Sequence, residues 1–120
     1  MIRSMKFAGI PVRNQDVALD FYTNKLGFSI VTDQPMGPGQ RWIELRTPHG
    51  EAGLALFTPK GHERRIGEFQ NLSFKCDDVE RTYRELLDRG VEFETPPTKQ
   101  PWGTYAIVKD PDGNTFVIAS

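Results

Sequence analysis

The chain repeats its own order of elements halfway along its length. Gly27 follows an apolar helical stripe, and Gly90 follows another such stripe 63 positions later (90 − 27). The turn Pro48-His49-Gly50 is matched at the same interval (111 − 48) by Pro111-Asp112-Gly113. A helix stop and a Pro-x-Gly turn at one spacing, within one order of elements, indicate two copies of a single supersecondary unit.

Each copy has the pattern of a strand, a helix and three further strands. In the first copy, a helix is expected over Gln15–Leu26, capped by Asn14, with strands at Met5–Val12, Phe28–Thr32, Arg41–Thr47 and Ala52–Thr58. In the second, a helix is expected from Asp77-Asp78 to Gly90, with strands at Asn71–Cys76, Val91–Thr95, Thr104–Lys109 and Thr115–Ala119. Loops are expected at Asp33–Gln40 and Thr95–Gly103. We therefore expect one α+β domain of two tandem βαβββ units, residues 1–58 and 69–120, with a linker at 59–68.

Charge and cysteine content exclude several classes of partner. The 15 Lys and Arg residues balance 16 Asp and Glu residues, which leaves no global basic field for nucleic acid. The single cysteine, Cys76, cannot form an internal disulfide and fits a reducing compartment. No signal peptide follows Met1–Met5, and no apolar run approaches the roughly 20 residues of a membrane span. We expect a soluble, cytoplasmic protein.

Three motifs carry a resemblance to a known family. They are the run FYTNKLGF (Phe21–Phe28), the helix start Asp77-Asp78-Val79 and the turn DPDGN (Asp110–Asn114) before the last strand. Together they make the chain resemble the vicinal oxygen chelate superfamily, which includes glyoxalase I, the extradiol dioxygenases and the bleomycin resistance proteins. The resemblance covers nearly the whole chain and implies a curled mixed sheet around a cleft. It also implies a homodimer.

The resemblance further implies where a divalent metal would bind in the enzymes of the family. Their ligands are His, Glu or Gln on the first and last strands of each unit. The matching positions here are Phe7, Leu54 or Ala55, Asn71 and Val117. Since a catalytic divalent site uses about three His or carboxylate ligands, these residues predict no metal and no cofactor.

Strand alternation predicts which side chains face the cleft. Ile10, Val12, Ile43 and Leu45 are expected in the core, which directs residues of the opposite parity to the other face. The predicted ligand-binding set is Phe7, Trp42, Glu44, Asn71, Ser73, Trp102, Tyr105 and Val117. Aromatic walls with a few polar groups are typical of a small-molecule pocket, and Trp42 beside Glu44 would suit a flat or cationic ligand.

Each of these assignments has an alternative. One alternative is that Phe7 and Val117 simply fill the cleft and leave no pocket, and Trp42 and Tyr105 would equally suit a dimer interface. The basic cluster Lys60, Arg64 and Arg65 is expected to be a solvated loop, or else to flank the cleft and attract an anion.

Three functions follow, in order of preference. The first is a metal-independent small-molecule-binding protein of the bleomycin resistance type. The second is a glyoxalase-like lyase or a dioxygenase-like metalloenzyme with relocated ligands, such as Glu44 with His49 or His62. The third is a structural or regulatory module with a filled cleft. A metal-free enzyme using Glu44 and Tyr105 as base and acid also stays open.

Overall fold

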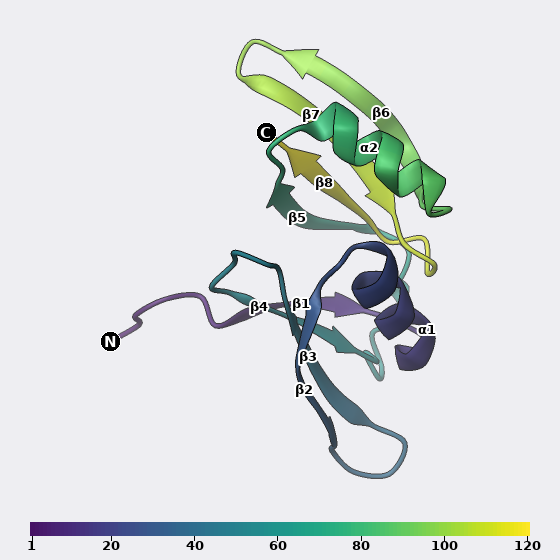
Figure 1. Cartoon of the computed structure of the whole chain (residues 1–120). Helices are drawn as coiled ribbons and strands as arrows, with labels where there is room; N and C mark the ends of the chain where they lie inside the picture. The colour runs from purple at the N-terminus through teal and green to yellow at the C-terminus, as the bar shows by residue number, and fades with distance from the viewer. The chain divides into compact units, whose positions relative to one another are not determined.

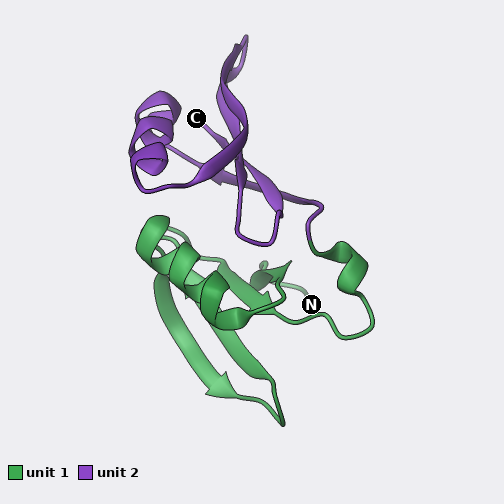
Figure 2. Cartoon of the chain, turned by 90° about the vertical axis from the view of Figure 1, so that its right-hand side faces the viewer, with its two compact units in different colours: residues 1–66 green, residues 67–120 purple.

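The computed structural model describes all 120 residues and divides them into two compact units (Figure 2). The first unit is Met1–Ile66 and the second is Gly67–Ser120, so the division falls inside the segment predicted as a linker. Each unit contains one strand, one helical segment and three further strands, in that order. The α+β class and the two tandem βαβββ units are confirmed.

The first unit forms one mixed four-stranded sheet. Its elements are β1 (Phe7–Pro11), α1 (Gln15–Asp20) with a following π-helix (Phe21–Lys25), β2 (Ser29–Pro35), β3 (Arg41–Arg46), β4 (Gly53–Phe57) and a short 3₁₀ turn (Glu63–Arg65) (Figure 1). The strand order is β1-β4-β3-β2. Strand β1 runs parallel to β4, and the other neighbours are antiparallel.

The second unit repeats this plan. Its elements are β5 (Phe69–Lys75), α2 (Val79–Asp88), β6 (Glu92–Gln100), β7 (Gly103–Lys109) and β8 (Thr115–Ala119) (Figure 1). The order β5-β8-β7-β6 corresponds strand for strand to the first sheet. Helix α2 packs against β6 and β7. No helix in either unit is both long and apolar enough to cross a lipid bilayer.

The helix signals seen in the sequence act as predicted. The Asn14 side chain accepts hydrogen bonds from the backbone N–H groups of Asp16 and Val17 at 2.9 and 3.1 Å. Asp78 caps α2 in the same way through the N–H of Arg81. Gly27 and Gly90 both have a φ of 82°, the left-handed conformation that ends a helix at little cost only with glycine.

Alternation along the strands separates a core face from an opposite face. Ile10, Ile43 and Leu45 are fully buried, whereas Trp42 and Glu44, of the opposite parity on β3, are only half-buried. The same alternation continues in β7, where Ala106 and Val108 are fully buried. The predicted faces of these strands are confirmed.

Two predicted loops are partly strand, and that part of the prediction was wrong. Strand β2 continues through Asp33 to Pro35, and β6 continues across Pro96 and Pro97 to Gln100. Both are edge strands, where a proline need not donate to a ladder. The pairing of β6 with β7 shifts register between Thr95 and Thr98, so a bulge accommodates the two prolines.

The DPDGN turn is held by side chains as well as by its backbone. Asp110 accepts hydrogen bonds from the backbone N–H groups of Asp112 and Asn114, both at 2.9 Å. The fully buried Asn114 donates its side-chain N–H to Asp110, and its oxygen accepts from Gly67 N–H and from the Gln70 amide. The matching turn of the first unit is closed by a backbone bond from Gly50 N–H to Thr47 O at 3.3 Å.

Candidate functional site

A pocket of about 440 Å³ lies within the first unit, on the sheet face opposite its apolar core. Three aromatic residues from three strands wall it: Phe7 on β1, Trp42 on β3 and Phe57 on β4. The rings of Phe7 and Trp42 meet edge to face, with their centroids 5.0 Å apart. This is a favourable aromatic geometry, and it fixes the angle between two walls of the pocket.

Glycine at position 9 allows the third wall to form. A Cβ built on Gly9 would lie 2.8 Å from Cε1 of Phe57, closer than real Cβ contacts. The Phe57 ring therefore lies across the bare backbone of β1. Any larger residue at position 9 would have to displace that ring.

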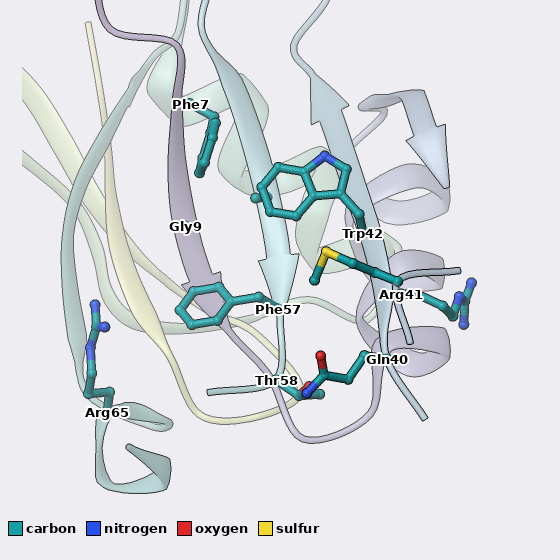
Figure 3. Close-up of a pocket in the computed structure, with 10 residues that line it drawn as sticks. Phe7, Gly9, Gln40, Arg41, Trp42, Phe57, Thr58 and Arg65 are labelled. Atoms are coloured by element: carbon teal, nitrogen blue, oxygen red, sulfur yellow. The ribbon is translucent and has the colours of Figure 1, made fainter. Parts of the chain in front are cut away.

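Polar side chains also line the pocket. Phe7 and Trp42 lie on one side of Phe57, Gln40 and Thr58 lie on the opposite side, and Arg65 lies across Phe57 from Gln40 (Figure 3). The guanidinium carbon of Arg65 lies over the Phe57 ring, 5.9 Å from the ring centroid. This is a cation–π contact, and it places a positive charge at the pocket wall.

Arg41 also lines the pocket, but its charge is held elsewhere. Its guanidinium binds both carboxylate oxygens of Asp33, at 3.1 and 2.8 Å, and also bonds to Asp16. Figure 3 shows the Arg41 side chain directed away from Phe57. The hydrogen bonds from Arg41 lower the pKa of Asp33, and the two carboxylates raise the pKa of Arg41. Arg41 therefore joins α1, β2 and β3 and brings little net charge to the pocket.

Gln15, at the start of α1, aligns the strands that carry two of the aromatic walls. Its side-chain N–H₂ donates to the carbonyl oxygens of Arg41 and Leu56, at 2.8 and 2.9 Å. These carbonyls adjoin Trp42 and Phe57 in the chain. The bond to Leu56 is buried and shielded from water, whereas the bond to Arg41 is only part-buried.

Of the residues predicted from the sequence, Phe7 and Trp42 come together in this pocket. Glu44 shares their sheet face, but its carboxylate lies over Gly53, where a Cβ would be 2.6 Å from Oε2. Glu44 is therefore not among the residues that line this pocket, and a role for it beside Trp42 in binding a ligand stays a prediction.

The remaining predicted residues belong to the second unit. Ser73 and Val117 are register partners on β5 and β8, and Asn71 occupies an irregular stretch of β5 with a φ of 55°. The rings of Trp102 and Tyr105 stack with centroids 6.0 Å apart, and Trp102 is 64% exposed. A role of these five residues in ligand binding stays a prediction.

Several lining residues were missed by the sequence reading. Phe57 has the parity of Gly53 and Ala55 on β4, so alternation would have found it. Met36 and Gln40 lie in the turn between β2 and β3, and Arg65 lies in the predicted linker, where no periodicity applies. Of the lining residues in these two loops, the sequence indicated only Arg65, as part of the basic cluster Lys60, Arg64 and Arg65.

The residues at the family's metal positions do not fit a metal. In the first unit, Ala55 rather than Leu54 shares the pocket face with Phe7, and both offer only carbon atoms. In the second unit, Val117 offers no atom that could ligate a metal, and Asn71 offers one amide oxygen on an exposed side chain. No three His, Cys, Asp or Glu side chains gather into a group that could hold an ion. We therefore derive no chemistry through a metal.

Comparison with known proteins agrees with this architecture. Residues 4–118 match the family described as the Glyoxalase/Bleomycin resistance protein/Dioxygenase superfamily. The chain is 34% identical over 119 residues to YetH, an uncharacterized protein of Bacillus subtilis (strain 168), covering 98% of each. A superfamily member from Sphaerobacter thermophilus DSM 20745 superimposes with a TM-score of 0.89 at 35% identity, covering 98% of this chain and 97% of that one.

A second solved structure is that of TnmS3, described as an antibiotic binding protein from Streptomyces sp. CB03234. Its TM-score is 0.85 at 31% identity, over 98% of this chain and 95% of that one. Matches of this extent, together with the paired βαβββ units, establish the family. The chain belongs to the Glyoxalase/Bleomycin resistance protein/Dioxygenase superfamily.

Proposed function

We propose that this chain binds a small, flat organic molecule in the pocket of its first unit and sequesters it without the help of a metal. The observation that carries the proposal is the aromatic pocket itself, with Phe7, Trp42 and Phe57 around a space of about 440 Å³. Pockets for small organic ligands commonly measure about 300–1,000 Å³ and have apolar, aromatic walls with a few polar groups. The donors at the Gln40 end supply such polar groups.

The family background supports binding rather than catalysis. TnmS3, at 31% identity over nearly the whole chain, is described as an antibiotic binding protein. The positions that carry metal ligands in the family's enzymes hold Phe7 and Ala55 in the unit that contains the pocket. We therefore place the ligand among aromatic, antibiotic-like molecules.

The two tryptophans allow a matched test with the neutral, flat probe N-phenyl-1-naphthylamine, which fluoresces in apolar surroundings. Trp42 is in the pocket, whereas Trp102 is largely exposed in the other unit. Wild type and Trp102→Ala should bind the probe alike, and Trp42→Ala should bind about tenfold more weakly, the loss expected for about 1.4 kcal/mol of stacking and burial. Equal binding by Trp42→Ala and wild type would contradict the proposal.

A thermal-shift screen of aromatic antibiotics would then identify the ligand class. A compound present at 100 times its Kd should stabilise the fold by about 2.7 kcal/mol. The shift should disappear in Trp42→Ala and persist in Trp102→Ala. Compounds that stabilise all three proteins equally bind outside this pocket.

The proposal includes a homodimer, which the resemblance to the family implies. Strand β2 presents the exposed apolar side chains of Ile30 and Val31, which a partner chain would cover. Sedimentation equilibrium distinguishes a monomer from a dimer directly, because one chain has a mass of 13.6 kDa and a dimer has twice that mass. A monomer at micromolar concentration would remove the dimer from the proposal and leave the pocket unaffected.

A further inference from the structure

The ten residues that line the pocket of the first unit divide by the chemistry of their side chains. Six are apolar or glycine, two are the arginines Arg41 and Arg65, and the last two are the uncharged polar residues Gln40 and Thr58. No carboxylate is among the ten, so the lining offers a cationic ligand no counter-charge. The polar group of a bound molecule must therefore be matched by one or more of the four polar side chains.

Both arginines are already engaged by other groups of the protein. The Arg41 guanidinium is bound by Asp33 and by Asp16. The Arg65 guanidinium lies over the Phe57 ring, where it forms part of a pocket wall. A ligand would have to compete with these contacts to bind either arginine, which makes the two uncharged residues the better partners for its polar group.

Gln40 and Thr58 combine fixed backbones with unpaired side chains. The Gln40 backbone N–H donates to the Gly37 carbonyl at 3.2 Å, and its own carbonyl accepts from Met36 N–H at 2.9 Å. The Thr58 carbonyl accepts from Lys60 N–H at 3.0 Å. Neither the Gln40 amide nor the Thr58 hydroxyl makes a hydrogen bond within the protein, so both groups are available to a ligand.

One side chain of α1 holds the chain beside both residues. The Gln15 amide donates to the carbonyl oxygen of Arg41, which directly follows Gln40, and to that of Leu56, two residues before Thr58. The two strands that bring Gln40 and Thr58 to the pocket are therefore tied to the same anchor. This limits the conformational freedom that a ligand would have to remove on binding.

The two unpaired groups lie together, across Phe57 from Trp42 (Figure 3). Besides this pocket, Gln40 and Thr58 jointly line two adjoining hollows, which places them near one another. Gln40 and Trp42 are two positions apart in the chain, so their Cα atoms are at most about 7 Å apart. A polar group attached directly to a flat bicyclic ring against Trp42 is within reach of the Gln40 amide.

The chemistry of these two groups specifies their partner. A primary amide has an acceptor oxygen and two N–H donors, and a hydroxyl both donates and accepts. A ligand group that only accepts or only donates would leave part of this capacity unpaired once water is displaced, which costs affinity. A carboxamide has the same combination of donor and acceptor as Gln40 and can form two reciprocal hydrogen bonds with it.

We infer that the ligand is an uncharged aromatic carboxamide or lactam, with its ring against Trp42 and its amide hydrogen-bonded to Gln40 and Thr58. The inference rests on the proposed function and deepens it by assigning the polar group and the orientation of the ligand.

Two probes of nearly equal shape test the hydrogen bonds separately from the aromatic contacts. 2-Naphthamide and 2-acetonaphthone differ only in that an NH₂ group replaces a methyl group. The amide is the more strongly hydrated, so a pocket with apolar contacts alone would bind the ketone more tightly. Displacement of N-phenyl-1-naphthylamine from wild type should instead show about fivefold tighter binding of the amide. 2-Naphthoate, with a charged carboxylate in the same position, should bind more weakly than the amide.

Variants locate the preference for the amide over the ketone. The double variant Gln40→Met and Thr58→Val keeps the approximate shape of both side chains and removes their hydrogen-bonding groups, so it should bind the ketone at least as tightly as the amide. Each single variant should show a preference between those of wild type and the double variant. Gln100→Met, at an exposed position of β6, should keep the wild-type preference. Circular dichroism and the urea midpoint of each variant establish that it is folded.

Each outcome has one meaning. If wild type binds the ketone as tightly as the amide, or if the double variant keeps the preference, the inference is overturned and the aromatic pocket stands. Tighter binding of 2-naphthoate than of 2-naphthamide overturns the assignment of an uncharged ligand. If Gln100→Met also loses the preference, the amide binds elsewhere and the inference is again overturned. If N-phenyl-1-naphthylamine does not bind wild type, the proposed function itself fails, and the inference fails with it.

Discussion

Substituting Gly9 tests how the pocket wall is built. In Gly9→Ala, the new Cβ would lie 2.8 Å from a ring carbon of Phe57, so the ring must move about 0.7 Å to reach an ordinary contact of about 3.5 Å. Overpacking of this kind costs about 1–3 kcal/mol. The low end applies, because the obstructing atom belongs to a side chain and not to the backbone.

An opposing effect reduces the net change. Gly9 lies in β1 without a positive φ, so alanine fits the backbone and restricts the unfolded chain, which stabilises by about 0.4–1 kcal/mol. We expect a net loss of about 1 kcal/mol in the free energy of unfolding. Affinity for N-phenyl-1-naphthylamine should fall as well, because Phe57 is a wall of the pocket.

A double-mutant cycle isolates the contact. Urea unfolding of wild type, Gly9→Ala, Phe57→Leu and the double variant gives the coupling between the two positions. In the Phe57→Leu background, Gly9→Ala should be neutral or slightly stabilising, which corresponds to a coupling of about 1 kcal/mol or more. Additive effects of the two substitutions would refute the claim that the ring requires glycine at position 9.

Three further predictions concern the surroundings of the pocket. Gln15→Leu should lower the free energy of unfolding by about 1–3 kcal/mol in urea, because it removes two hydrogen bonds to backbone carbonyl oxygens, one of them buried; a loss below about 0.5 kcal/mol would mean that water replaces the amide. The pKa of Asp33 is depressed in the folded state, so its stabilising effect is present above its unfolded pKa of about 3.9 and is lost as pH falls through the folded value. The difference in urea midpoint between wild type and Asp33→Asn should therefore be constant near neutral pH and shrink in acid, and a difference independent of pH would contradict this assignment. Protein purified without chelator should contain well below about one equivalent of Ni, Zn, Fe or Mn, measured by elemental analysis, and a stoichiometric metal would contradict the reading of Phe7 and Ala55 as non-ligands.

The features that the sequence predicted well are those set by local chemistry. The caps at Asn14 and Asp78 and the stops at Gly27 and Gly90 depend on a few neighbouring residues, and the structure contains all four. The alternation of β3 also identified the faces of the sheet. Phe7 and Trp42 were placed together by parity alone.

The features that the sequence did not predict depend on contacts between residues that are distant in sequence. Edge position decides whether Pro96 is compatible with a strand, and edge position follows from the whole sheet order. The direction of the Glu44 side chain depends on Gly53 of the neighbouring strand. Arg65 enters the pocket only because the chain after β4 turns back toward Phe57, and no periodic pattern marks that turn.

The two corresponding turns, at 47–50 and at 110–114, differ in the hydrogen bonds that must break before each turn can open. Opening the second requires the loss of several hydrogen bonds around Asp110 and the buried Asn114, whereas the first is closed by a long backbone bond at Gly50. Local opening free energies follow such differences, so amide hydrogens beside the 47–50 turn should exchange with solvent sooner than those beside the 110–114 turn. The hairpin of β3 and β4, which carries Trp42 and Phe57, is then the one that can open briefly while the second unit keeps its hairpin closed. A ligand that binds in this pocket would contact the hairpin of β3 and β4, which opens more readily than its counterpart in the second unit. Its binding would be detected first as slowed amide hydrogen exchange in that hairpin.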